Sequence, residues 1–206
     1  AKAITLSGAD VDGDDLTYSI VSDVSNGSTS LSGSTVTYTP GSNFNGTDTF
    51  TYKANDGTAD SNTSTVTITV TAVNDAPVTS DQTASTNEDT AKAITLSATD
   101  VEGDSVTYSI VSDASNGNTS LSGSTVTYTP TANYNGTDTF TFKANDGTTD
   151  SNTSTVTVTV TAVNDAPITS SVSASTNEDT AKAITLTGTD VDGDDLTYSI
   201  VSDVSN

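Results

Sequence analysis

Ser154-Thr-Val-Thr-Val-Thr-Val-Thr161 decides the fold class, because its residues alternate with a period of two. Val156, Val158 and Val160 point to one side of an extended chain, and the threonines point to the other. Thr is β-branched, so it favours a strand while remaining polar on the outer face. The stretch therefore predicts a β-strand with one buried face.

Six further segments around it show strand patterns, and turn dipeptides such as Asn116-Gly117 and Asp146-Gly147 separate them. The predicted strands cover about 82–86, 91–98, 105–112, 118–121, 125–129, 138–144 and 153–163. No stretch has the period of an amphipathic helix. Seven short strands without cysteine predict an all-β fold, a seven-stranded antiparallel β-sandwich of two sheets. Its predicted inward face comprises Ile94, Leu96, Val106, Tyr108, Ile110, Leu121, Val126, Tyr128, Phe140, Phe142, Val156, Val158 and Val160.

The sequence repeats with a period of 90 residues, since AKAITL begins at Ala1, Ala91 and Ala181. Residues 1–90 and 91–180 are identical at 73 of 90 positions. Val163-Asn-Asp-Ala-Pro167 and its copy 73–77 provide short, stiff links. We therefore expect beads on a string: a repeat 1–76 that lacks its first strand, a complete repeat 77–166, and the N-terminal part of a third, 167–206. The chain is interpreted as a segment cut from a longer array of such repeats.

Composition excludes several functions. The chain has 27 acidic and 5 basic residues, a formal net charge of −22, and no Cys or His. Disulfides, ordinary zinc sites and a Ser–His–Asp triad are thus excluded. Nucleic acid and anionic lipid would repel such a surface. The short apolar runs predict no membrane insertion of this segment. A low aliphatic content with high charge is typical of disorder, but the strand alternation outweighs that indication.

An ordered set of motifs carries a family resemblance: Asn87-Glu-Asp-Thr90, Asp100-Val-Glu-Gly-Asp104, Asn133-Tyr-Asn-Gly-Thr-Asp138, Asn145-Asp-Gly147 and 163–167. The set resembles the bacterial cadherin-like, immunoglobulin-like tandem repeats of large extracellular adhesins. The resemblance implies calcium ions between successive domains. Between the second and third repeats it implies the ligands Glu88, Asp138, Asn164, Asp165, Asp190 and Asp192; between the first and second, Asp48, Asn74, Asp75, Asp100, Glu102 and Asp146.

The acidic loops support calcium on their own chemistry. Asp190-Val-Asp-Gly-Asp194 places alternating carboxylates around a glycine, and calcium prefers six to eight oxygen ligands on loops that can wrap it. Carboxylates that close together repel unless a cation neutralises them. The alternative is that the acids are simply solvated and keep the protein soluble. Ala162 and Ala166 replace polar residues of the cadherin linker, so one or two ions per junction are expected.

We therefore expect a structural role, a calcium-rigidified spacer segment of a long extracellular adhesin or stalk, cell-surface attached or secreted. Its partners would be neighbouring repeats of the same chain. The alternative is a repeat unit that assembles with other copies into an extracellular filament or sheath. A carbohydrate- or protein-binding module is a third hypothesis, although the aromatic residues occupy mostly inward strand positions. An enzyme is not expected, because near-identical beads have no cleft-forming loops.

Overall fold

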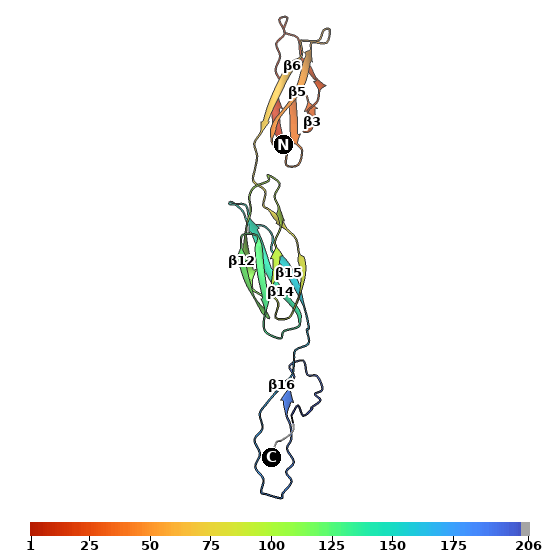
Figure 1. The fold of residues 1–206 in the computed structure, drawn as a ribbon. Helices are drawn as coiled ribbons and strands as arrows, with labels where there is room; N and C mark the ends of the chain where they lie inside the picture. Colours follow the sequence, from red (N-terminus) through yellow and green to blue (C-terminus); the bar gives the residue numbers. More distant parts are fainter. Residues whose placement is uncertain (203–206) are drawn as a thin grey trace. The chain divides into compact units, whose positions relative to one another are not determined.

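The computed structural model describes residues 1–202. The chain divides into two compact units, Ala1–Asp75 and Ala76–Asn206. Every regular element among residues 1–202 is a β-strand, which confirms the all-β prediction (Figure 1). No helix in these residues has the length and apolar character needed to cross a membrane.

The second unit contains a complete sandwich. One sheet has the strand order β11-β14-β15-β8 and the other β12-β13-β9, with β14 and β15 side by side in Figure 1. The strands are β8 (Gln82–Asn87), β9 (Lys92–Thr95), β11 (Thr107–Ser112), β12 (Gly117–Ser122), β13 (Thr125–Pro130), β14 (Gly136–Asn145) and β15 (Ser154–Thr161). All seven coincide with predicted strands to within a few residues.

The observed topology differs from a purely antiparallel sandwich in one pair. β8 runs parallel to β15, with Val158 opposite Ala84. These two strands come from opposite ends of the unit, so a parallel pair needs no tight turn between them. A short antiparallel pair, β7 (Val78–Thr79) with β10 (Ala98–Thr99), was not predicted, because two-residue strands have no periodicity to detect.

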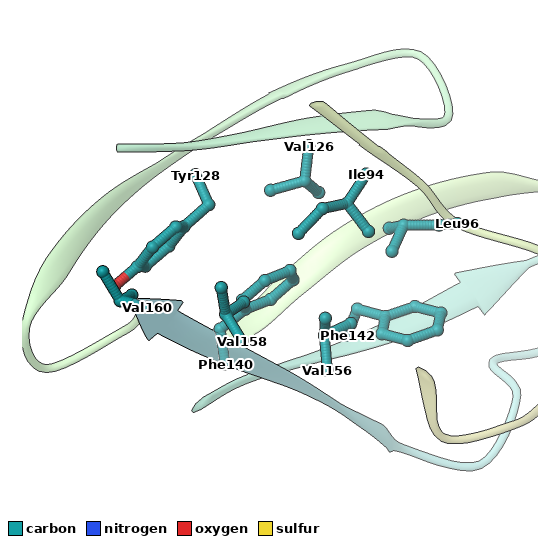
Figure 2. Packing of buried hydrophobic residues seen from close by; sticks show 9 residues of the cluster. All are labelled: Ile94, Leu96, Val126, Tyr128, Phe140, Phe142, Val156, Val158 and Val160. Carbon is teal, nitrogen blue, oxygen red and sulfur yellow. The ribbon is translucent and has the colours of Figure 1, made fainter. Parts of the chain in front are cut away.

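The core lies between the two sheets. Ile94, Leu96, Val126 and Tyr128 face Phe140, Phe142, Val156, Val158 and Val160, and all nine are buried (Figure 2). Tyr108, Ile110 and Leu121 pack partly buried against this cluster, as do Ala84 and Tyr134. Val106 was predicted to face the core, but it is only half-buried and lies outside the cluster.

The first unit repeats the architecture with one strand fewer. Its sheets have the orders β1-β4-β3 and β2-β5-β6. The strands are β1 (Lys2–Thr5), β2 (Thr17–Ser22), β3 (Gly27–Ser32), β4 (Thr35–Pro40), β5 (Gly46–Asn55) and β6 (Ser64–Val70). The registers match across the 90-residue period: Asp48 is opposite Ile68, and Asp138 is opposite Val158. Among residues 1–202, no strand pairs with the outer edge of β6.

Residues 167–202 form little regular structure. One short pair, β16 (Ile168–Thr169) with β17 (Gly188–Thr189), is present. The apolar residues that would enter a sandwich core, Ile184, Leu186, Tyr198 and Ile200, are exposed. The described residues of this segment form no opposing sheet to cover these side chains.

Candidate metal centre

The acidic loop occurs three times with one local geometry. One oxygen of the first aspartate accepts hydrogen bonds from backbone N–H groups two and four residues ahead. For Asp100 the donors are Glu102 at 3.1 Å and Asp104 at 3.0 Å. For Asp190 they are Asp192 at 2.9 Å and Asp194 at 3.3 Å. Gly103 closes its loop with φ +79°, a left-handed value that glycine accepts without strain. The loop's own backbone therefore fixes one oxygen of its first aspartate, and the other oxygen of Asp100, Oδ2, is left without a hydrogen-bond partner.

In the second unit, Asp165 lies in the linker 163–167, close to the turn that follows β8. The backbone N–H of Asp165 donates to Asp192 Oδ2 at 2.7 Å. Glu88 is only 4% exposed; its N–H donates to Thr161 O at 2.9 Å, and its Oε1 accepts from Val163 N–H. Of the ligands predicted for this junction, Glu88, Asp165, Asp190 and Asp192 are thus brought into one neighbourhood.

The carboxyl of Asp165 is affected by its acidic neighbours. Burial raises the pKa of the Asp165 carboxyl, and the charges of Asp192, Asp89, Glu88 and Asp190 raise it further. Such a rise means that the ionised form is disfavoured where it stands. Four like charges acting on one carboxylate are what a bound cation would relieve.

Asp89 belongs to this group, although sequence reasoning missed it. Its backbone φ is +56°, and its Oδ1 accepts from Asn133 N–H at 3.1 Å, which ties the turn after β8 to the loop before β14. The available signal was its position next to Glu88 in Asn87-Glu-Asp-Thr90. A short polar residue such as Asp tolerates the left-handed conformation of that turn.

Two carboxylate oxygens in these loops test the fit of a metal ion. Asp165 Oδ2 and Asp100 Oδ2 are buried, and neither has a hydrogen-bond partner. A buried polar atom without a partner costs free energy, so each calls for a ligand. Beside Asp165 lies a cavity of about 500 Å³, lined by Asn133, Asp165, Ala166, Ile168, Thr189, Asp190 and Val191. Four of its seven lining residues, Asn133, Asp165, Thr189 and Asp190, have side-chain oxygens, the ligand atoms that a hard cation such as calcium prefers.

The acids are close but not closed into a coordination sphere. Among residues 1–202, no group of three or more Asp or Glu side chains is already arranged to hold a metal ion. An ion would therefore have to draw carboxylates inward. The flexibility that calcium tolerates in its ligand geometry makes this feasible.

Asp48 and Asp138 have a structural role within their own units. Asp138 is 4% exposed, and its oxygens accept from Ser115 N–H at 3.1 Å, Asn116 N–H at 2.8 Å, Thr139 N–H at 2.9 Å and the Tyr128 hydroxyl at 3.1 Å. Asp48 accepts the equivalent four bonds from residues 25, 26, 49 and 38. Four donors of the same unit already occupy each carboxylate, so both residues hold their sandwich together, and their part in a calcium site stays a prediction.

The remaining predicted ligands divide between the two units. Asn74 and Asn164 brace the linkers, each donating from Nδ2 to the carbonyl oxygen of the following aspartate, Asp75 and Asp165, at 3.1 and 2.8 Å. Asp146 Oδ1 accepts from Thr148 and Thr149 N–H, both at 2.6 Å. Asp75 ends the first unit, whereas Asp100, Glu102 and Asp146 belong to the second. Their grouping around one ion stays a prediction.

The fold defines this chain as a tandem array of cadherin-like, immunoglobulin-like sandwiches. The bacterial Ig domain family matches residues 1–69 and 74–159, and the chain belongs to that family. No curated protein matches the sequence. Repeats of this family and fold point to extracellular structural or adhesin-type domains, and the fold is typical of non-enzymatic domains.

Solved structures share the fold at low identity. The human CDH23 fragment EC21-23 is similar with a TM-score of 0.60 and 21% identity, over 85% of this chain and 68% of that one. Human mucin-like protocadherin EC1-2 is similar with a TM-score of 0.50 and 18% identity, over 72% of this chain and 85% of that one. An endo-fucoidan hydrolase of glycoside hydrolase family 107 matches at a TM-score of 0.35 and 23% identity, over 78% of this chain. This chain spans about a quarter of that enzyme, 26%.

Proposed function

We propose that the chain is a spacer segment of an extracellular adhesin or stalk, and that calcium stiffens it at the junctions between repeats. The observation that carries the proposal is Asp165: its Oδ2 is buried without a partner, and four other carboxylates disfavour its charge. A divalent cation would convert that repulsion into attraction.

The donor set suits calcium better than a softer metal. Glu88, Asp89, Asp165, Asp190 and Asp192 offer carboxylate oxygens, and the 500 Å³ cavity beside Asp165 leaves room for water ligands. Transition metals prefer imidazole or thiolate ligands, and the chain contains neither His nor Cys. When bound, the ion would tie the linker to the turn after β8 and to the acidic loop after β17.

The near-identity of the repeats supports a mechanical role. With 73 of 90 positions identical, successive units have not diversified for recognition of different ligands. Length and stiffness are what such units add to a chain. By linkage, an ion that binds only the folded, aligned junction also stabilises it.

Calorimetric titration of the full chain with calcium tests the proposal. The double variant Asp165→Asn/Asp192→Asn removes two charges of the cluster, and Asn side chains keep the size of the originals. We expect it to lose at least one binding event. The matched control Asp113→Asn removes an acid that bonds Thr119 on an exposed surface, and it should titrate as the parent does. Equal binding by all three proteins, or none by the parent, would exclude calcium at this junction.

A further inference from the structure

The chain enters the second sandwich and leaves it through two strands that pair with each other. The linker 73–77 leads into β7 and β8, and β15 leads into the linker 163–167. β8 and β15 are neighbours in one sheet and run parallel over six residue pairs, which begin with Gln82 opposite Val156. Entry and exit therefore lie at opposite ends of one ladder of hydrogen bonds.

A tensile force along the chain would shear this ladder. The linkers pull β8 at the start of the ladder and β15 at its end, so the two strands are drawn past each other along their length. The hydrogen bonds of a parallel pair are evenly spaced, so they share the force and have to break together. Six pairs give a ladder about 20 Å long. A force that pulled the same ends of both strands apart would instead break the bonds one at a time.

Side chains extend the connection ahead of the first pair. The Asn152 amide binds the backbone of Thr79 twice: Oδ1 accepts from Thr79 N–H at 3.0 Å, and Nδ2 donates to Thr79 O at 3.0 Å. The Thr79 hydroxyl lies 2.8 Å from the Ser154 hydroxyl, and both residues are buried. Asp81 Oδ1 accepts from Thr155 N–H at 2.8 Å. These bonds join the segment ahead of β8 to the start of β15.

A buried glutamate extends the connection beyond the last pair. The Glu88 N–H donates to Thr161 O at 2.9 Å, and Glu88 Oε1 accepts from Val163 N–H. Because Glu88 is buried, water competes little for these two bonds. With both ends fastened, the connection between the two strands runs from Thr79 to Val163.

We propose that β8 and β15 form a mechanical clamp that resists unfolding of the repeat under tension, and that Asn152, Asp81 and Glu88 lock its two ends. The inference rests on the proposed spacer role, because a spacer that joins a cell to a distant attachment point carries tension. It assigns resistance within a repeat, whereas calcium is proposed to act between repeats. The clamp consists of hydrogen bonds within one unit, so it needs no calcium.

Single-molecule pulling of the full chain in chelator tests the clamp. The chain has no cysteine, so introduced cysteines give unique attachment points. Ala76→Cys with Ala166→Cys pulls the ladder in shear. Ser80→Cys with Thr153→Cys pulls the same two strands apart from one end, and all four positions are exposed. Unfolding in shear should require a force higher by about twofold or more, since the bonds break together. Equal forces in the two directions would overturn the proposal.

Two proline variants locate the resistance on β8. The Glu88 N–H points toward β15, and N–H directions alternate along a strand, so the N–H of Ala84 also faces β15 and that of Ser85 faces the outer edge of the sheet. Ala84→Pro removes a bond of the ladder and should lower the unfolding force in shear. Ser85→Pro removes only an outward N–H and should keep the parent's force. Equal forces for the two variants would overturn the assignment to this pair of strands.

The bonds at the ends of the clamp have a separate test that leaves the strands intact. Asp81→Ala removes the acceptor of Thr155 N–H, and in shear it should unfold about threefold faster or more. Asp113→Ala removes an exposed acid that accepts one bond from Thr119, and it should unfold as the parent does. An unchanged rate for Asp81→Ala would refute the role of the end bonds. Calcium enters none of these measurements, so their result is independent of whether calcium binds at the junction.

Discussion

Replacement of Asp138 by Asn tests the structural role of the buried carboxylate. Its two oxygens each accept two hydrogen bonds, one pair from Ser115 and Thr139 N–H and the other from Asn116 N–H and the Tyr128 hydroxyl. An amide keeps one oxygen and turns an NH₂ donor toward the other pair. The Tyr128 hydroxyl can turn to Asn116 O, 3.5 Å away, but at least one buried N–H loses its acceptor. The loss of these charge-assisted hydrogen bonds should lower the free energy of unfolding of the second unit by about 2–4 kcal/mol.

Scanning calorimetry of the full chain in chelator measures this cost. For a unit of this size, the expected loss lowers the melting temperature by roughly 10 °C or more. The first unit, which has its own Asp48, should keep its transition. Asp113→Asn provides the control, because that exposed side chain accepts a hydrogen bond from the hydroxyl of Thr119 at the surface. If Asp138→Asn melted within error of the parent, the four bonds would not stabilise the sandwich and the reasoning would be refuted.

Three further predictions address acid stability, close packing and the core. Burial alone would raise the pKa of the Asp48 carboxyl, but backbone N–H donors and the Tyr38 hydroxyl lower it below its usual value. The stability that the Asp48 carboxylate contributes is therefore present above roughly pH 4 and lost as the pH falls below that. Melting curves across that range should show this loss. Asp48→Asn should show less of it but not none, because hydrogen bonds also lower the pKa of Asp56 and Asp60 in the same unit. Gly117→Ala should destabilise the second unit by about 1–3 kcal/mol in urea titration, because a Cβ at this position would lie 2.5 Å from Tyr128 Cε2. An unchanged urea midpoint would contradict this close packing. Phe140→Ala should lower the free energy of unfolding by about 3–5 kcal/mol in the same titration, since Phe140 is 0% exposed. A loss smaller than that of Gly117→Ala would contradict the central place of Phe140 in the core.

The sandwich could be predicted from the sequence because its signals are local. Alternation in 154–161 and turn dipeptides such as Asn116-Gly117 mark strands and their ends without reference to distant residues. The direction of β8 could not be read this way. Its pairing depends on a contact 74 positions away, between Gln82 and Val156, and a period of two is the same for parallel and antiparallel strands.

The candidate site was predicted only in part for a similar reason. Asp190 and Asp192 carry the alternating pattern of a loop around a glycine, whereas Asp138 was predicted as a ligand only from the family resemblance. Only tertiary structure shows that Asp138 points into its own unit, where four donors saturate it. Asp89 was missed because membership of the cluster depends on the turn that brings it to Asn133.

The binding of calcium at the junction is the central claim, and its most direct test is small-angle scattering of the full chain in calcium and in chelator. In calcium we expect a larger maximum dimension and a narrower distribution of interatomic distances, because the ion ties Asp165 to Glu88 and Asp192. Asp165→Asn/Asp192→Asn should weaken this response, and Asp113→Asn should retain it in full. Identical profiles with and without calcium would contradict the account.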